Sequence, residues 1–108
     1  MQTLCALVIQ LLLSFPVHAE SGIASVYTRS EGKWTASGER MSNDTLTAAH
    51  RTLPLGTLVA VHFGHKVAIV RINDRGPWVK HRILDLTPRA ARVLGIDGLG
   101  FVRLEPVK

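Results

Sequence analysis

Two neighbouring segments, residues 57–63 and 66–72, most constrain how this chain can fold. In the first segment, Thr57, Val59, Val61 and Phe63 alternate with Leu58, Ala60 and His62. Gly64-His65 connects this segment to residues 66–72. Such alternation is typical of strands with one face in a core, and a short connection containing glycine favours a tight turn. The sequence therefore predicts an antiparallel β-hairpin near the middle of the chain.

Further strands are predicted on both sides of this hairpin. Their expected ranges are residues 22–27, 81–86 and 100–107, with a short ordered piece over 46–50 and turns over 53–56 and 73–77. The polar, glycine-containing segment 28–43 is predicted to be a long surface loop, and loops of that length in small domains are more often functional than idle.

One short helix is expected between the last two strands. Thr87 supplies a hydroxyl N-cap, Pro88 suits the first helical position, and Gly95 suits the stop. Together the elements predict an all-β domain of six strands and one short helix. A closed small barrel is favoured over an open sheet, because no polar face repeats along whole strands.

Residues 1–19 differ in character from the rest of the chain. They contain no Asp, Glu, Lys or Arg, and residues 4–15 form an almost unbroken apolar stretch. This stretch is too short to span a bilayer, and the small residues around Ala19 suit a signal-peptidase site. We therefore expect a signal peptide over 1–19, one domain over 20–108, and secretion to the periplasm or the extracellular cell envelope. A retained membrane anchor and a buried helix of the fold remain open alternatives.

Cysteine and charge narrow the chemistry of the secreted part. The only cysteine, Cys5, would leave with the signal peptide, so no disulfide, thiol chemistry or lipid anchor is expected after cleavage. The formal net charge is +5, and it resides in the secreted part. A basic surface favours anionic partners such as nucleic acid, acidic lipids or envelope polymers, although it can also serve solubility alone.

Three carboxylates are candidates for chemistry because of where they lie. Asp74 follows an apolar strand and enters a Gly-Pro turn, where half-burial would favour the protonated form that a general acid needs. The alternative is an Asx-turn acceptor held by the backbone and Arg75. Asp85 interrupts an apolar run, and a structural role is favoured there, either capping the helix start or pairing with Arg75 or Arg82. Glu39 follows a short polar run in the long loop.

Histidines and aromatic residues complete the candidates. His62-x-x-His65 has the spacing of a metal pair, but a structural zinc site needs four ligands, so no metal is expected. His50 fits either a core edge or a site. Sugar rings stack on aromatic faces, but aromatic side chains fill cores more often, and the candidates near the loops are Tyr27, Trp34 and Trp78. The chain lacks phosphate-loop, nucleophile-elbow and zinc-protease motifs, so no cofactor is expected.

Several motifs together resemble the rare lipoprotein A family across nearly the whole secreted part. They are Gly22-x-Ala24-Ser25-x-Tyr27, Thr35-Ala36-Ser37-Gly38-Glu39, residues 46–57, Asn73-Asp74-Arg75-Gly76-Pro77 and Asp85-Leu86-Thr87. The resemblance implies a six-stranded double-psi β-barrel and an endolytic lytic transglycosylase of peptidoglycan.

The resemblance also assigns residues to roles. The family's functional Asp, Glu and His fall on Asp74, Glu39 and His50, which we expect to be catalytic. The residues expected to contact substrate are Tyr27, Trp34, Ser37, Arg75, Trp78 and Asp85. Asp85 resembles the acidic residue of the same barrel in expansins.

The implied reaction cleaves the bond between N-acetylmuramic acid and N-acetylglucosamine and leaves 1,6-anhydromuramic ends. The expected partner is the glycan strand, bound by a monomer without nucleic acid. A non-catalytic, expansin-like wall-binding or wall-loosening module is the main alternative, since fold does not dictate function. A nucleic-acid-binding barrel rests only on net charge and loses support if the chain is exported.

Overall fold

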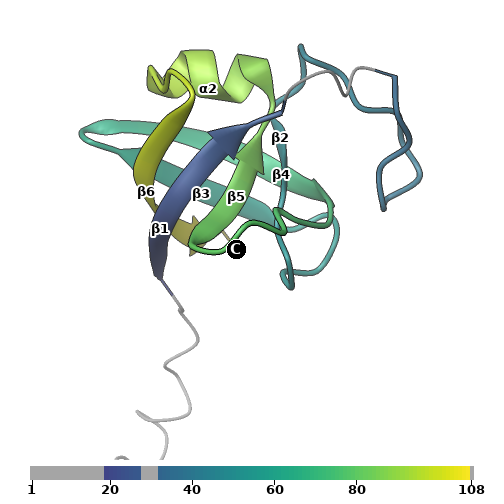
Figure 1. Cartoon of the computed structure of the whole chain (residues 1–108), viewed down its shortest axis with the longest axis horizontal. Helices are drawn as coiled ribbons and strands as arrows, with labels where there is room; N and C mark the ends of the chain where they lie inside the picture. The colour runs from purple at the N-terminus through teal and green to yellow at the C-terminus, as the bar shows by residue number, and fades with distance from the viewer. Residues whose placement is uncertain (1–18, 28–31, 108) are drawn as a thin grey trace, which may run out of the picture.

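The computed structural model describes residues 19–27 and 32–107. Within these residues, six strands close into a barrel and one helix lies across one end of it (Figure 1). The elements are β1 (Glu20–Val26), β2 (Thr47–Ala49), β3 (Leu58–Phe63), β4 (Lys66–Asp74), β5 (Arg82–Leu86), α2 (Pro88–Leu94) and β6 (Leu99–Pro106). The predicted all-β fold with six strands and one short helix is confirmed. Residues 1–18 of the predicted signal peptide lie outside the described residues, as do residues 28–31 of the predicted loop.

The strands follow the closed order β1-β5-β2-β4-β3-β6. The β1/β5 and β2/β4 pairs are parallel, and the other four pairs are antiparallel. The predicted hairpin is the β3/β4 pair, with Phe63 opposite Lys66. The three-residue strand β2 pairs with β4 on one side and with β5 on the other. One short strand therefore separates the ends of β4 and β5.

The barrel encloses a core of aliphatic side chains. On β3 and β4 the inward positions alternate, and Val59, Val61, Val70 and Ile72 are fully buried. Strands β5 and β6 add Ile83, Leu84, Leu86, Val102 and Leu104. Burial of this apolar surface is the main favourable term in folding a domain that has no disulfide among its described residues.

Helix α2 has the caps that the sequence predicts. The Thr87 side chain accepts a hydrogen bond from the Ala90 N–H, and Gly95 ends the helix in the left-handed conformation at φ 79°. The apolar face of Ala90, Ala91 and Leu94 packs on the barrel core. No helix among the described residues is long and apolar enough to cross a membrane.

The structure corrects the predicted turn over 73–77. Strand β4 continues through Asn73 to Asp74, because Asp74 pairs with Ala49 of β2 after a register shift. The chain leaves the sheet only after Asp74, and the Gly76–Pro77 peptide is cis. Asp74 is therefore the last residue of β4, and its backbone is held by pairing with Ala49 of β2.

Candidate active site

Four strands meet in one row at the candidate site. Ser25 of β1 is opposite Asp85 of β5, Asp85 is opposite Ala49 of β2, and Ala49 is opposite Asp74 of β4. The register of the barrel thus brings Asp74 and Asp85 to either side of a single residue. Two predicted site residues, Asp74 and Asp85, therefore lie in this row, and a third, His50, directly follows Ala49.

The Asp74 carboxylate accepts hydrogen bonds from three donors. Its Oδ1 accepts the N–H groups of Ala36 at 3.0 Å and Arg75 at 2.9 Å. Its Oδ2 accepts the hydroxyl of Tyr27 at 3.1 Å. Two donors are fixed backbone groups and one is a hydroxyl that can also accept. The Asx-type acceptor role that the sequence left open is present, and it leaves Oδ2 as the oxygen with an adaptable partner.

Tyr27 is linked electrostatically to this carboxylate. Burial, followed by the negative charge of Asp74 and the hydrogen bond to it, raises the pKa of Tyr27 far above its ordinary value. The phenol therefore keeps its proton throughout the neutral range and remains a donor to Asp74.

Glu39 forms a bidentate ion pair with Arg71 of β4. The two guanidinium nitrogens lie 2.6 and 3.1 Å from the carboxylate oxygens. The Arg71 hydrogen bonds, aided by the side chains of Asn73 and Ser37, lower the pKa of Glu39 to about 2 against the opposing effect of burial. Glu39 is consequently ionised at any physiological pH and cannot serve as a proton donor there.

The segment around Glu39 places a donor on Asp74. The Thr35 N–H bonds to the Glu39 carbonyl at 2.9 Å, and the Ser37 N–H bonds to the Asn73 carbonyl at 3.0 Å. The Ser37 hydroxyl lies 3.2 Å from Glu39 Oε1. These bonds fix the backbone on both sides of Ala36, whose N–H reaches Asp74.

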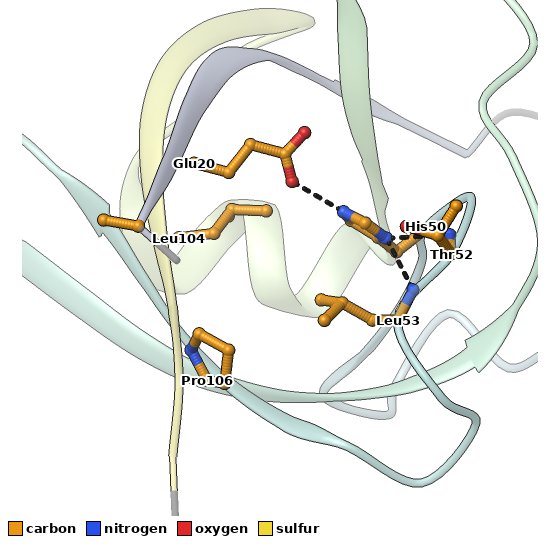
Figure 2. A pocket seen from close by; sticks show the side chains of 7 residues that line it. Glu20, His50, Thr52, Leu53, Leu104 and Pro106 are labelled. Atoms are coloured by element: carbon orange, nitrogen blue, oxygen red, sulfur yellow. Dashed lines mark hydrogen bonds and ion pairs between the residues drawn. The ribbon is translucent and has the colours of Figure 1, made fainter. Parts of the chain in front are cut away.

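Among the described residues, the hydrogen-bond partners of the His50 imidazole are Glu20, Thr52 and Leu53, and they do not include the Asp74 carboxylate. Its Nε2 lies 2.8 Å from Glu20 Oε1, and its Nδ1 accepts the N–H groups of Thr52 and Leu53 at 3.1 and 3.0 Å. Figure 2 shows the ring and the Glu20 carboxylate pointing toward each other, and both residues line a pocket of about 600 Å³. His50 touches Asp74 through the backbone, where its N–H donates to the Asp74 carbonyl at 3.1 Å.

Asp85 and Arg75 are held by partners of their own. The Ser25 hydroxyl donates to Asp85 Oδ1 at 2.6 Å, and the ion pairs between described residues do not include Asp85. The expected pairing with Arg75 or Arg82 is therefore wrong, and so is helix capping, which Thr87 performs. The Arg75 guanidinium donates to the carbonyls of His50 and Leu53.

The two tryptophans do not fill the core. Trp34 is 67% exposed and Trp78 is 75% exposed. The Arg40 guanidinium lies 4.3 Å above the centre of the Trp34 ring. Trp34 precedes Ala36, and Trp78 follows Arg75, so both exposed rings belong to segments that supply donors to Asp74.

Sequence reasoning missed three partners of the site: Arg71, Ser25 and Glu20. Arg71 carried a weak signal, since it is the one charged residue between the apolar positions of its strand. Ser25 lies in the Gly22-x-Ala24-Ser25-x-Tyr27 motif, but the motif alone does not assign it a role. Glu20 carried no signal, because its partner His50 lies 30 residues away in the sequence.

The closed order of the strands, with two parallel pairs and a carboxylate row at the strand ends, defines a double-psi β-barrel protein with an acidic site. A family model described as lytic transglycolase matches residues 19–105. The chain belongs to this family.

Named proteins of several bacteria are similar in sequence to this chain. The chain is 51% identical over 92 residues to the "Probable endolytic peptidoglycan transglycosylase RlpA" of Nostoc sp.. This alignment covers 78% of this chain and 24% of that protein. The chain is 47% identical over 96 residues to the "Endolytic peptidoglycan transglycosylase RlpA" of Pasteurella multocida, covering 84% of this chain and 33% of that protein. The chain thus spans a quarter to a third of the length of these relatives.

Two solved structures share the fold. Streptomyces papain inhibitor has a TM-score of 0.67 at 19% identity, covering 86% of this chain and 98% of that one. The apo expansin of Clavibacter michiganensis has a TM-score of 0.68 at 20% identity, covering 84% of this chain and 51% of that one. At this identity the likeness establishes the double-psi barrel fold and nothing further.

Proposed function

We propose that this protein is a lytic transglycosylase that cleaves the glycan strands of peptidoglycan. The names of the RlpA relatives support the reaction class. The observation that carries the proposal is the Asp74 carboxyl, with Oδ1 fixed by two backbone N–H groups and Oδ2 facing a hydroxyl. This asymmetry leaves one oxygen suited to exchange a proton.

The proposed chemistry uses Oδ2 twice. When Oδ2 is protonated, the Tyr27 hydroxyl can turn to accept, while the Oδ1 bonds are unchanged. Oδ2 gives its proton to the glycosidic oxygen, which leaves as the 4-hydroxyl of N-acetylglucosamine as the muramic C1–O bond breaks. The anomeric carbon passes through an oxocarbenium-like state, and the muramic 6-hydroxyl oxygen bonds to it. The ionised Asp74 takes the hydroxyl proton, so no water is consumed and the acid is regenerated.

Glu39 and His50 support Asp74 in this scheme. Glu39 stays ionised and, with Arg71, holds the segment that aims the Ala36 N–H at Asp74. Tyr27, Trp34, Ser37, Arg75, Trp78 and Asp85 remain proposed substrate contacts. The two exposed tryptophans also favour a second candidate, a glycan-binding module that does not cleave, because exposed aromatic faces bind sugars without chemistry.

Mass spectrometry of purified glycan strands after incubation with the protein tests the proposal. Fragments ending in 1,6-anhydromuramic acid are expected from the native protein, and Asp74→Asn should lower their rate of formation at least about 100-fold. Asp97→Asn makes the same chemical change at an exposed carboxylate near the start of β6, outside the candidate site, and should leave the rate unchanged. Intact strands that co-sediment with the protein would support the binding module. Reducing-end fragments would mean hydrolysis.

Location and assembly belong to the same proposal. We propose that residues 1–19 are removed after export, that the domain works as a monomer in the cell envelope, and that it acts without nucleic acid, metal or cofactor. A reporter fused to residues 1–19 should be active only outside the cytoplasm. Sedimentation of the purified protein should give the mass of one chain.

A further inference from the structure

We propose that Glu20 and His50 are positioning residues that form a brace behind Asp74, with His50 exchanging no proton with the substrate. The link to activity rests on the proposed function. The brace itself is a property of the folded chain, so it can be tested whether or not the chain cleaves glycans. Neither the family match nor the relatives assign a role to Glu20.

The hydrogen bonds of the imidazole define its tautomer. Nδ1 accepts two backbone N–H groups, from Thr52 and Leu53, so it presents a lone pair and carries no proton. Nε2 then carries the ring proton and donates it to Glu20 Oε1. Both nitrogens are engaged in the fold, and a ring in this state has no free nitrogen with which to take a proton from a sugar hydroxyl.

Burial makes the Glu20 partner necessary. The His50 residue is only 5% exposed, whereas the Glu20 side chain is 45% exposed at the edge of the pocket. A buried N–H group that has no acceptor costs the free energy of its lost hydrogen bond to water. Glu20, at the first position of β1, therefore holds the ring in the orientation that Figure 2 shows.

The braced turn connects to Asp74 by two routes. The His50 N–H donates to the Asp74 carbonyl, which continues the β2/β4 pairing by one residue. The Arg75 guanidinium donates to the carbonyls of His50 and Leu53 at 3.1 and 2.7 Å. Arg75 also supplies the backbone N–H that binds Asp74 Oδ1. A shift of the turn over 50–53 would therefore move a donor of the catalytic carboxyl.

A second arginine ties the same turn to the chain beyond Asp74. Arg51 donates through Nε to the carbonyl of Pro77 and through Nη2 to the carbonyls of Val79 and Arg82. Arg75 reaches from the segment after β4 to the turn, and Arg51 reaches from the turn to that segment. The hydrogen bonds of the His50 ring hold the turn over 50–53 in one conformation. The arginine contacts can therefore transmit the position of this turn to the segment after Asp74.

Nitrogen-15 NMR of the histidine rings in the native protein tests the brace directly. We expect His50 to show a proton on Nε2 and an acceptor Nδ1, and the Thr52 and Leu53 amides to exchange slowly. Glu20→Ala should speed exchange at both amides by about tenfold or more, because one lost hydrogen bond weakens the local structure. Glu20→Gln should retain slow exchange, because its amide oxygen can accept from Nε2.

The chain offers a matched control in a second His–Glu pair. His62 Nε2 lies 2.8 Å from Glu105 Oε1, the same separation as in the proposed brace, on the outer side of β3 and β6. Glu105→Ala should leave the Thr52 and Leu53 amides unchanged. A proton on His50 Nδ1 in the native protein, or equal exchange in Glu20→Ala and native protein, would overturn the proposal.

Kinetics on glycan strands provide the second readout. Glu20→Ala should lower kcat by about 10- to 100-fold with KM little changed, since small displacements of reacting groups have effects of this size. Glu20→Gln should recover most of the loss, and Glu105→Ala should be neutral. A native protein that cleaves nothing would refute the proposed function while the NMR result still judges the brace. A fall in kcat with unchanged amide exchange would refute the brace alone.

Discussion

The Tyr27 hydroxyl donates to Asp74 Oδ2 across 3.1 Å, and among the described residues it is the one side-chain donor to this carboxylate beside two backbone N–H groups. The bond joins the end of β1 to the end of β4, two strands that are not neighbours in the barrel. A hydroxyl at this point can follow the protonation state of Asp74, which backbone N–H groups cannot do.

Replacement of Tyr27 by phenylalanine should therefore affect catalysis more than folding. We expect Tyr27→Phe to lower kcat by about tenfold, as the loss of one hydrogen bond to a charged group implies. Because the pKa of Tyr27 is raised, the native phenol should also stay protonated in alkaline assays. Steady-state kinetics from pH 6 to 10 check both points. An unchanged kcat in Tyr27→Phe would remove Tyr27 from the scheme.

The Glu39–Arg71 ion pair should make stability depend on pH in acid. The pKa of Glu39 is lowered from 4.5 to about 2 in the folded chain, so the stabilisation is fully present above pH 4.5 and is lost as pH falls toward 2. After allowance for solvent screening at this half-exposed pair, we expect a loss of about 1 kcal/mol. Urea unfolding of native protein and Glu39→Gln between pH 2 and 6 measures it.

Glu39→Gln should flatten that acid dependence, whereas Asp97→Asn, at an exposed residue near the start of β6, should leave it as in the native protein. Equal pH dependence in native protein and Glu39→Gln would show that the ion pair contributes nothing to stability.

The Thr87 hydroxyl should be important for stability. It is fully buried, donates to the Thr45 carbonyl and accepts from the Ala90 N–H. Thr87→Ala removes a helix cap and takes away the hydroxyl donor of the Thr45 carbonyl, so we expect a loss of about 2 kcal/mol of unfolding free energy. Thermal unfolding followed by circular dichroism measures the change. Thr87→Ser keeps the hydroxyl and should lose less than half as much.

The exposed tryptophans should affect binding without affecting folding. Trp34→Ala and Trp78→Ala should each weaken co-sedimentation with glycan strands, by about 1 kcal/mol for each lost stacking surface. Their unfolding free energies should stay within about 0.5 kcal/mol of native, because neither ring is in the core. Val79→Ala, at the exposed neighbour of Trp78, is the matched control. Undiminished binding in both tryptophan variants would place the glycan elsewhere.

The sequence predicted those parts of the fold that local signals encode. The hairpin of β3 and β4 follows from alternation and a glycine turn, and helix α2 follows from Thr87, Pro88 and Gly95. The end of β4 could not be predicted, because Asn73 and Asp74 are turn formers, yet here they continue the strand and Asp74 pairs with Ala49 of β2. A tertiary partner overrides local preference in that case.

The site shows the same division. Asp74, Glu39 and His50 could be named from motifs, and the row through Ala49 explains why two of them lie together. Their partners could not be named, because Arg71 lies 32 residues from Glu39 and Glu20 lies 30 residues from His50. No spacing pattern in a strand or helix relates residues at such separations, which only barrel closure brings together.

The pairing of β1 with both β5 and β6 has a consequence for the order of events in the cell. The first strand cannot complete its hydrogen bonds until the last strand, Leu99–Pro106, has been made. Long-range pairing of this kind is slow compared with local structure. The local β3/β4 hairpin can form as soon as its own residues have been made, but the barrel can close only after residues 99–106 have been added.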